Sequence, residues 1–160
     1  MSPRAARAAP AIVLATLNAK YIHASLGLRY LLANMGELRP RTVLREFTVA
    51  SAAREIADAL LLELGGAAPA KDEVQIVGFG VYVWNVRQTT ALLRLRKAAR
   101  PQLKIVLGGP EVSHELAGRE IVELADHVVT GWGDLAFAQL CRSLLAGTPV
   151  GKVIAGGTAP

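Results

Sequence analysis

The chain has 160 residues, of which 52% are hydrophobic and 5% aromatic, so it carries enough Ala, Val, Leu and Ile for the core of one domain. Charged residues break its longest apolar runs well before the length of a bilayer span, and residues 1–10 lack the apolar stretch of a signal peptide. We therefore expect a cytoplasmic protein without a membrane partner, preceded by a disordered tail at residues 1–10.

The net charge of +5 does not by itself indicate nucleic acid, because the basic residues are scattered and no stacking aromatics lie among them. Several belong to one amphipathic segment, where we expect a solvated helix face: Arg87, Arg94, Arg96, Lys97 and Arg100. No nucleic-acid partner is expected.

Cysteine and histidine content restricts metal chemistry. The single cysteine, Cys141, excludes an internal disulfide and any site that needs several thiolates of this chain, and we expect it to be buried on a helix face. His114 and His127 have no partner at metal-ligand spacing. No metal-binding residues are therefore predicted.

Short β-type runs alternate with helical patterns along the chain. In order, the sequence predicts strand 11–17, helix 25–35, strand 42–47, helix 51–64, strand 74–79, helix 86–99, strand 104–107, helix 113–124, strand 127–130 and helix 134–145. Asn85 and Gln88 suggest an N-cap for the third helix. Strand 42–47 is the least apolar and suits a sheet edge.

Five successive β/α units imply an open, doubly wound, mostly parallel five-stranded sheet with helices on both faces, a flavodoxin-like or Rossmann-like α/β fold. We assign residues 11–150 to this domain. Residues 151–160, with Gly156-Gly157 and the final Pro160, suggest an exit linker toward a C-terminal domain, although a small extra strand in this segment stays open.

Glycine follows three of the predicted strands, in the segments Gly78-Phe79-Gly80, Gly108-Gly109-Pro110 and Gly131-Trp132-Gly133. Glycine permits a positive φ and a close approach of a ligand to the main chain. In such sheets the ligand lies beyond the carboxyl ends of the strands. We therefore expect a binding edge built from loops 18–24, 80–85, 108–112 and 131–134.

The loop after the first strand contains neither Gly-x-Gly-x-x-Gly nor a P-loop, and no Ser/Thr/Gly-rich phosphate turn. Acidic residues of a phospho-acceptor are also missing after the first and third strands. The pocket is therefore suited to a large, mostly uncharged ligand.

The four loops together resemble the N-terminal cobalamin-binding domain of B12-dependent radical SAM proteins. The matching segments are Asn18-Ala19-Lys20-Tyr21-Ile22-His23-Ala24-Ser25-Leu26, Gly78-Phe79-Gly80-Val81-Tyr82-Val83-Trp84-Asn85, Leu107-Gly108-Gly109-Pro110-Glu111-Val112 and Gly131-Trp132-Gly133-Asp134. The resemblance covers about residues 11–150 and implies a set of cofactor-binding residues: Asn18, Ala19, Lys20, Tyr21, Ile22, His23, Gly80, Val81, Tyr82, Trp84, Asn85, Gly108, Gly109, Pro110, Glu111, Val112, Gly131, Trp132 and Gly133.

Individual positions follow or depart from the family pattern. Gly108 and Gly109 match the Gly-Gly where the nucleotide tail of cobalamin passes the backbone, whereas Gly80 replaces a usual Ser and loses its hydroxyl. Trp132 stands where an acid is usual. Glu111 is open to two interpretations, a cobalamin contact or a bond to backbone N–H groups of its own helix start.

The mutase-type motif Asp-x-His-x-x-Gly is not reproduced, because Tyr21 stands in place of Asp and Gly27 is one position late. The resemblance therefore implies base-off cobalamin without an Asp-tuned His ligand. His23 is open to three interpretations, as a cobalt ligand, a capping residue or a packing residue, and Tyr21 or Ile22 is a candidate for covering the lower corrin face.

Radical SAM chemistry needs three closely spaced cysteines, so this chain alone is expected not to be catalytic. The resemblance implies a domain that presents cobalamin to a radical SAM domain of the same longer chain, which would hold S-adenosylmethionine and a 4Fe-4S cluster, for methyl transfer or related radical chemistry. Two alternatives stay open: a flavodoxin-like binding or interaction module without corrinoid, and a transferase domain that uses a nucleotide.

Overall fold

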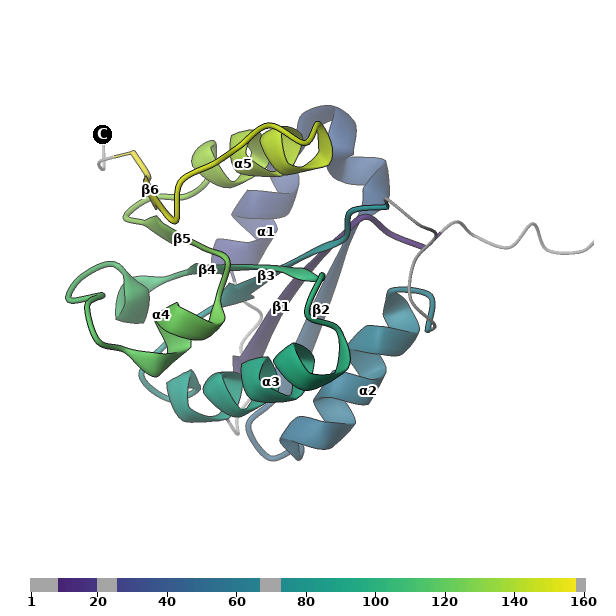
Figure 1. Ribbon diagram of the computed structural model, residues 1–160, viewed down its shortest axis with the longest axis vertical. Helices are drawn as coiled ribbons and strands as arrows, with labels where there is room; N and C mark the ends of the chain where they lie inside the picture. Colours follow the sequence, from purple (N-terminus) through teal and green to yellow (C-terminus); the bar gives the residue numbers. More distant parts are fainter. Residues whose placement is uncertain (1–8, 20–25, 67–72, 158–160) are drawn as a thin grey trace, which may run out of the picture.

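The computed structural model describes residues 9–19, 26–66 and 73–157, which form three layers with a parallel sheet between two groups of helices (Figure 1). The strands are β1 (Ile12–Asn18), β2 (Thr42–Thr48), β3 (Ile76–Gly80), β4 (Lys104–Gly108), β5 (His127–Thr130) and β6 (Val153–Ala155). The helices are α1 (Leu26–Ala33), η1 (Gly36–Arg41), α2 (Ala53–Glu63), α3 (Val86–Ala99), η2 (Pro110–Val112), α4 (Glu120–Leu124) and α5 (Ala136–Leu145). The α/β fold class is confirmed.

The strand order is β2-β1-β3-β4-β5-β6, and every neighbouring pair is parallel. The first connection leads from β1 outward to β2, and the chain then returns to the other side of β1 as β3. The order therefore reverses between β1 and β3, which places a topological switch point at their carboxyl ends. The less apolar β2 lies at the edge of the sheet, as predicted.

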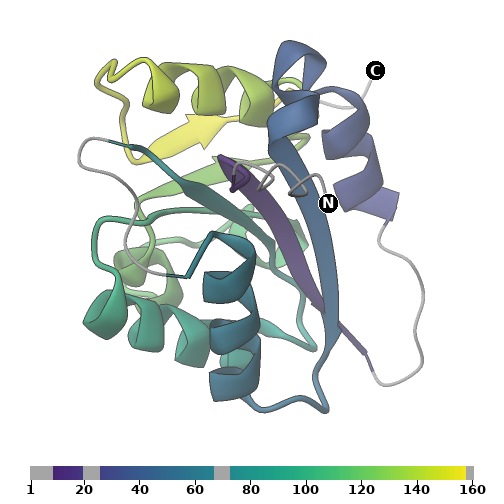
Figure 2. The ribbon, with the colours of Figure 1, turned by 90° about the vertical axis from the view of Figure 1, so that its right-hand side faces the viewer.

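Each face of the sheet is covered by its own helices. On one face Ile56 and Leu60 of α2 and Leu93 of α3 pack in a cluster with Val77 of β3. On the other face α1, η1 and α5 enclose a second cluster (Figure 2). Burial on both faces accounts for the continuous apolar run of β3, whose five residues are all buried.

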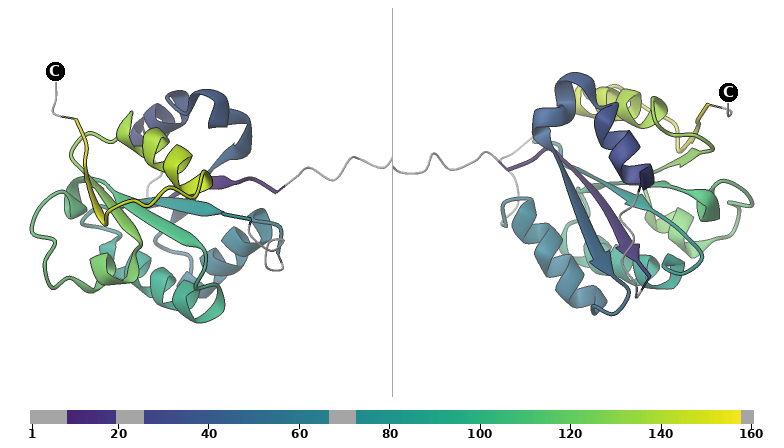
Figure 3. Two further views of the ribbon diagram at one scale, coloured as in Figure 1. Left: turned by 45° about the horizontal axis from the view of Figure 1, so that its top comes forward. Right: turned by 180° about the vertical axis from the view of Figure 1, so that it is seen from behind.

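The expected strand count of five is wrong, because β6 adds a sixth strand, the small extra strand that the sequence left open in residues 151–160. Val128, Val129 and Thr130 of β5 pair with Val153, Ile154 and Ala155, and β6 runs beside β5 at the edge of the sheet (Figure 3). Helix α5 packs on the α1 face, whereas α3 and α4, which connect strands in the same direction, pack on the opposite face. The β5-α5-β6 crossover is therefore opposite in hand to the preceding ones, an uncommon arrangement.

The helix expected over 113–124 is also wrong over its first half, because only Glu120–Leu124 is α-helical. Glu115 has φ 52° and Gly118 has φ 74°, and two left-handed residues so close together interrupt a right-handed helix. The short 3-10 helix η2 ends at Val112, just before this region.

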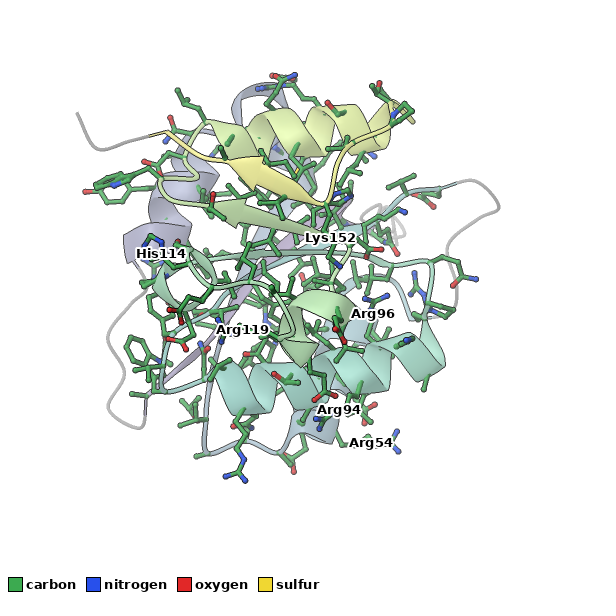
Figure 4. All side chains as sticks on the ribbon, turned by 60° about the vertical axis from the view of Figure 1, so that its left-hand side comes forward. Arg54, Arg94, Arg96, His114, Arg119 and Lys152 are labelled. Atoms are coloured by element: carbon green, nitrogen blue, oxygen red, sulfur yellow. The ribbon has the colours of Figure 1, made fainter. Side chains whose placement is uncertain are left out.

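Basic side chains gather around α4 (Figure 4). Lys152 donates to the carbonyl of Ala125 at 2.6 Å, and Arg96 donates to the carbonyl of Leu124. Both cations thus bind carbonyls at the carboxyl end of α4, where positive charge is favourable. The Arg96 side chain is only 11% exposed, and burial lowers its pKa. Arg100 is also buried and donates to Gln75 Oε1 at 2.9 Å, so the expectation of a solvated face is wrong for both residues.

No helix in the described part of the chain has the length and apolar character needed to cross a bilayer.

Candidate functional site

A cavity of about 670 Å³ opens at the carboxyl ends of β3, β4 and β5, between α1 and α5. Its inner wall is largely apolar and includes Leu28 and Leu31 of α1, Val106 of β4, Val129 of β5 and Phe137 of α5. A volume of this size is ordinary for a small-molecule site. The cavity therefore lies where the sheet topology predicts a ligand.

Three glycines of the strands and their exits shape the wall for different reasons. A Cβ on Gly78 would lie 2.9 Å from the Phe137 ring, so glycine here lets α5 approach the sheet. A Cβ on Gly108 would meet only the Val129 carbonyl oxygen, at 3.8 Å, and otherwise open space. Gly108 thus leaves backbone bare at the cavity.

The structure shows why position 109 needs glycine, which the sequence alone did not reveal. Its φ is +107°, and a Cβ would lie 2.6 Å from the carbonyl oxygen of Val81. Glycine at 109 therefore lets the loop after β4 lie directly against the loop after β3, while the residue also lines the cavity.

Asn85 holds the loop after β3 in place from a fully buried position. Its Oδ1 accepts the N–H of Tyr82 at 2.9 Å, and its Nδ2 donates to the carbonyls of Leu17 at 3.0 Å and Gly80 at 3.1 Å. Its side chain makes no capping bond to α3, and Gln88 donates to the Ser51 carbonyl. Asn85 thus occupies the N-cap position of α3 as predicted, but the expected capping bonds are not made, and its side chain instead ties the ends of β1 and β3 together.

Tyr82 and Trp84 form an aromatic stack on this loop, with ring centroids 4.5 Å apart and planes 7° from parallel. Trp84 Nε1 donates to the Leu17 carbonyl at 3.1 Å, which fixes the stack to the end of β1. Trp84 is 49% exposed, whereas Tyr82 lines the cavity. The stack thus joins the cavity wall to the outer surface.

The loops after β4 and β5 are connected by Ser113. Its hydroxyl donates to the Gly109 carbonyl at 2.9 Å and accepts the N–H of Gly131 at 3.2 Å. On its far side the loop after β5 pairs with the chain beyond β6, through two bonds between Trp132 and Gly157 at 3.1 and 2.9 Å. The glycine-bearing loops are therefore held by hydrogen bonds on both sides.

Polar side chains at the cavity include His114 and Asp134. His114 lies in the segment after β4 and η2 (Figure 4). Glu111 does not bond its own helix start, since Oε1 pairs with Arg119 Nη2 at 3.3 Å and Arg119 also donates to the Glu111 carbonyl. This pair braces the segment between η2 and α4.

The structure brings eight of the expected binding residues to the cavity wall: Gly80, Tyr82, Gly108, Gly109, Pro110, Gly131, Trp132 and Gly133. Six others do not line it: Asn18, Val81, Trp84, Asn85, Glu111 and Val112, of which Val81, Asn85 and Val112 are wholly buried. Ala19 is exposed. Lys20, Tyr21, Ile22 and His23 lie outside the described residues.

Sequence reasoning missed the part of the wall that comes from the two helices and from buried strand residues. Among the missed residues are Gly27, Leu31, Ser113 and Phe137. The glycine at position 27 could have indicated this part of the wall, because a glycine inside an apolar helix pattern indicates close packing. Phe137 carries no local signal and reaches the cavity only through the packing of α5.

Cys141 lies on the buried face of α5 with no exposed surface, as predicted. Burial raises the pKa of its thiol to about 12. A neutral, enclosed thiol of this kind is a packing residue rather than a nucleophile or a metal ligand.

The parallel sheet, the switch point and the glycine-lined cavity define a ligand-binding domain of the flavodoxin-like class. The sequence model of one family, the B12 binding domain, matches residues 12–141. The chain belongs to this family of cobalamin-binding domains. A search of curated proteins returned no match to the chain.

The residues present fit a corrinoid. The cavity is large, mostly apolar and open at the sheet edge, and Gly108 offers backbone with free space on its side-chain position. Trp84 and Trp132 place broad apolar surfaces beside the opening, 49% and 58% exposed. A slender tail can enter such a cavity while a flat macrocycle remains at its edge.

Proposed function

We propose that this domain binds cobalamin in the base-off form, with the nucleotide tail in the cavity between α1 and α5 and the corrin ring at the carboxyl edge of the sheet. The observation that carries the proposal is the glycine-lined cavity of about 670 Å³ at this edge in a B12-binding family member. Its place between the two helices suits the slender tail, and the sheet edge outside it leaves room for the broad ring.

The expected binding residues divide by role in this proposal. Gly108 gives backbone access, Gly109 lets the loop after β4 pack against Val81, Asn85 and Ser113 hold the loops in position, and Trp84 and Trp132 provide apolar surface at the opening. Bound cobalamin would supply a cobalt centre able to carry a methyl group. The protein's own contribution is to orient that centre and exclude water from the tail.

We further propose that the domain serves a radical SAM domain of a longer chain. The resemblance of the four loops supports this partner, and Cys141, the one cysteine of the sequence, is buried and cannot hold a cluster. S-adenosylmethionine and a 4Fe-4S cluster would then reside in the partner domain. Methyl transfer or a related radical reaction is the proposed outcome.

Exposed apolar side chains support a partner at this edge. Among the described residues, Tyr30, Val83, Trp84, Trp132 and Leu135 are large hydrophobics with 49 to 74% of their surface exposed. They come from α1 and from the loops after β3 and β5, and two of them, Tyr30 and Trp132, line the cavity. Exposed apolar surface next to a ligand site is typical of a contact area.

The binding test uses hydroxocobalamin and gel filtration. We expect a visible absorption band that elutes with the protein, at a ratio of cobalamin to protein near one. A protein fraction that stays colourless at saturating cobalamin contradicts the binding proposal and favours an interaction module without corrinoid.

The base-off form is tested separately, on the bound cofactor reduced to cob(II)alamin. Its electron paramagnetic resonance spectrum should lack the nitrogen splitting of a coordinated axial base. Nitrogen splitting that disappears in a His23→Ala variant would instead identify His23 as the lower ligand.

A further inference from the structure

The Tyr82 side chain spans the cavity wall from β3 to α1. A Cβ on Gly80 would lie 3.3 Å from Tyr82 Cε2, and a Cβ on Gly27 would lie 3.3 Å from the Tyr82 hydroxyl oxygen. Both glycines line the cavity together with Tyr82. The two missing side chains therefore leave the slot in which the tyrosine ring lies.

The position of the ring is fixed on its other sides. Trp84 stacks on it at 4.5 Å, and the buried Asn85 accepts the backbone N–H of Tyr82 at 2.9 Å. Because Trp84 is itself bonded to the Leu17 carbonyl, the phenol cannot swing outward without breaking the stack. The hydroxyl is thus held beside Gly27, one of the α1 residues that line the cavity.

The hydroxyl of Tyr82 makes no hydrogen bond to any part of the chain that the structure describes. This contrasts with the nearby Ser113 and Thr16, whose hydroxyls are used inside the protein, Thr16 donating to the Gly80 carbonyl at 3.1 Å. A phenol held in place without a partner, in a largely apolar cavity, is available to a ligand.

We infer that the Tyr82 hydroxyl donates a hydrogen bond to the nucleotide tail of the corrinoid and makes binding depend on a hydrogen-bond acceptor there. The inference rests on the proposed cobalamin binding. It explains why position 80 is glycine, since any side chain there would crowd the Tyr82 ring. It also makes Tyr82 a specificity residue that separates complete cobamides from tail-less ones.

The test compares wild type and Tyr82→Phe with three ligands by absorbance titration: cobalamin, cobinamide, which lacks the nucleotide tail, and a cobamide whose lower base is a phenol without ring nitrogen. Removing one hydrogen bond should weaken cobalamin binding about three- to tenfold. The variant should bind cobinamide as wild type does. If Tyr82→Phe loses the same affinity for cobalamin and for the phenol-based cobamide, the hydroxyl contacts the phosphate or ribose of the tail rather than its base.

Two further measurements keep the outcome unambiguous. The thermal midpoint of Tyr82→Phe should match wild type, because the ring and its stack remain. Gly27→Ala, which places a methyl 3.3 Å from the hydroxyl, should shift the hydroxyl slightly and weaken cobalamin binding more than cobinamide binding. Wild type that fails to bind cobalamin overturns the proposed function, whereas wild type that binds and a Tyr82→Phe variant with unchanged affinity for all three ligands overturns this inference alone.

Discussion

The Ser113 hydroxyl accepts the backbone N–H of Gly131 at 3.2 Å and so joins the loop after β4 to the loop after β5. The same hydroxyl donates to the Gly109 carbonyl at 2.9 Å. Two glycine-bearing loops, each free to adopt many conformations alone, are therefore held in one relative position. This preorganisation lowers the cost of ordering the cavity edge when a ligand binds.

Ser113→Ala should weaken cobalamin binding about twofold to tenfold and lower the free energy of unfolding by about 1–2 kcal/mol, because it removes two ordinary hydrogen bonds. Absorbance titration and urea denaturation measure the two effects. Ser143→Ala is the matched control, because Ser143 lies in α5 outside the cavity lining. Equal affinities of the two variants would show that the bridge does not organise the site.

Asn85→Ala should lower the free energy of unfolding by about 2–4 kcal/mol, because it leaves the Tyr82 N–H and the Leu17 and Gly80 carbonyls without this partner in a buried place. The control is Asn34→Ala, which removes an exposed bond to the Tyr30 carbonyl and should cost less than about 1 kcal/mol. Denaturant unfolding of both variants measures the difference. Similar costs at the two positions would contradict the role assigned to Asn85.

Gly109→Ala should be strongly destabilising, because its Cβ would lie 2.6 Å from the Val81 carbonyl oxygen in a residue with φ +107°. Gly66→Ala is the control for backbone strain alone, since Gly66 has φ +76° and nothing within 4 Å of its Cβ position. We expect Gly66→Ala to cost about 1 kcal/mol, and Gly109→Ala clearly more. Equal thermal midpoints would mean that the close contact with Val81 has no energetic weight.

Gly108→Ala separates binding from folding. Its Cβ meets only the Val129 carbonyl oxygen at 3.8 Å, so the thermal midpoint should change little. The methyl group would occupy the cavity edge, and cobalamin affinity should fall at least tenfold. Titration and a thermal melt on the same preparation test this, and full affinity in the variant would place the ligand away from Gly108.

The fold could be predicted largely from the sequence because apolar runs of strand length alternate with helical periodicity, and glycine ends three of the strands. Strand β6 was only an open alternative to a linker, because it has three residues, Val153–Ala155, and follows a crossover of the uncommon hand. The helix at 113–124 was overextended because an apolar pattern does not reveal the positive φ of Glu115. The hydrophobic pattern of a sequence does not report backbone angles of this kind.

The cavity residues that lie in loops could be predicted from the sequence. Those that reach the cavity through the packing of helices could not. Gly80, Gly108 and Gly131 mark strand exits in the sequence, and all three line the cavity. Phe137 and Leu31 reach the same cavity from helices far apart in the chain. Asn85 looked like a capping residue because its position before a helix is the usual one, and its buried bonds to β1 depend on tertiary contacts.

Cys141 gives a pH-dependent prediction. Burial raises its thiol pKa from 9.0 to about 12 in the folded protein. The stability that this neutral thiol contributes is complete below pH 9 and is lost as the pH rises toward 12, because only the unfolded chain releases the proton in that window. Unfolding of wild type and Cys141→Ala at pH 8 and pH 10.5 should show a larger pH loss for wild type, and parallel losses would contradict this.

Titration of the purified chain with hydroxocobalamin, followed by gel filtration and a visible spectrum of the protein peak, tests the central claim most directly. We expect wild type to retain cobalamin at a ratio near one, and Gly108→Ala to retain much less while eluting at the same volume. A colourless wild-type peak, or equal retention by both proteins, would contradict a corrinoid site at the glycine-lined edge of the sheet.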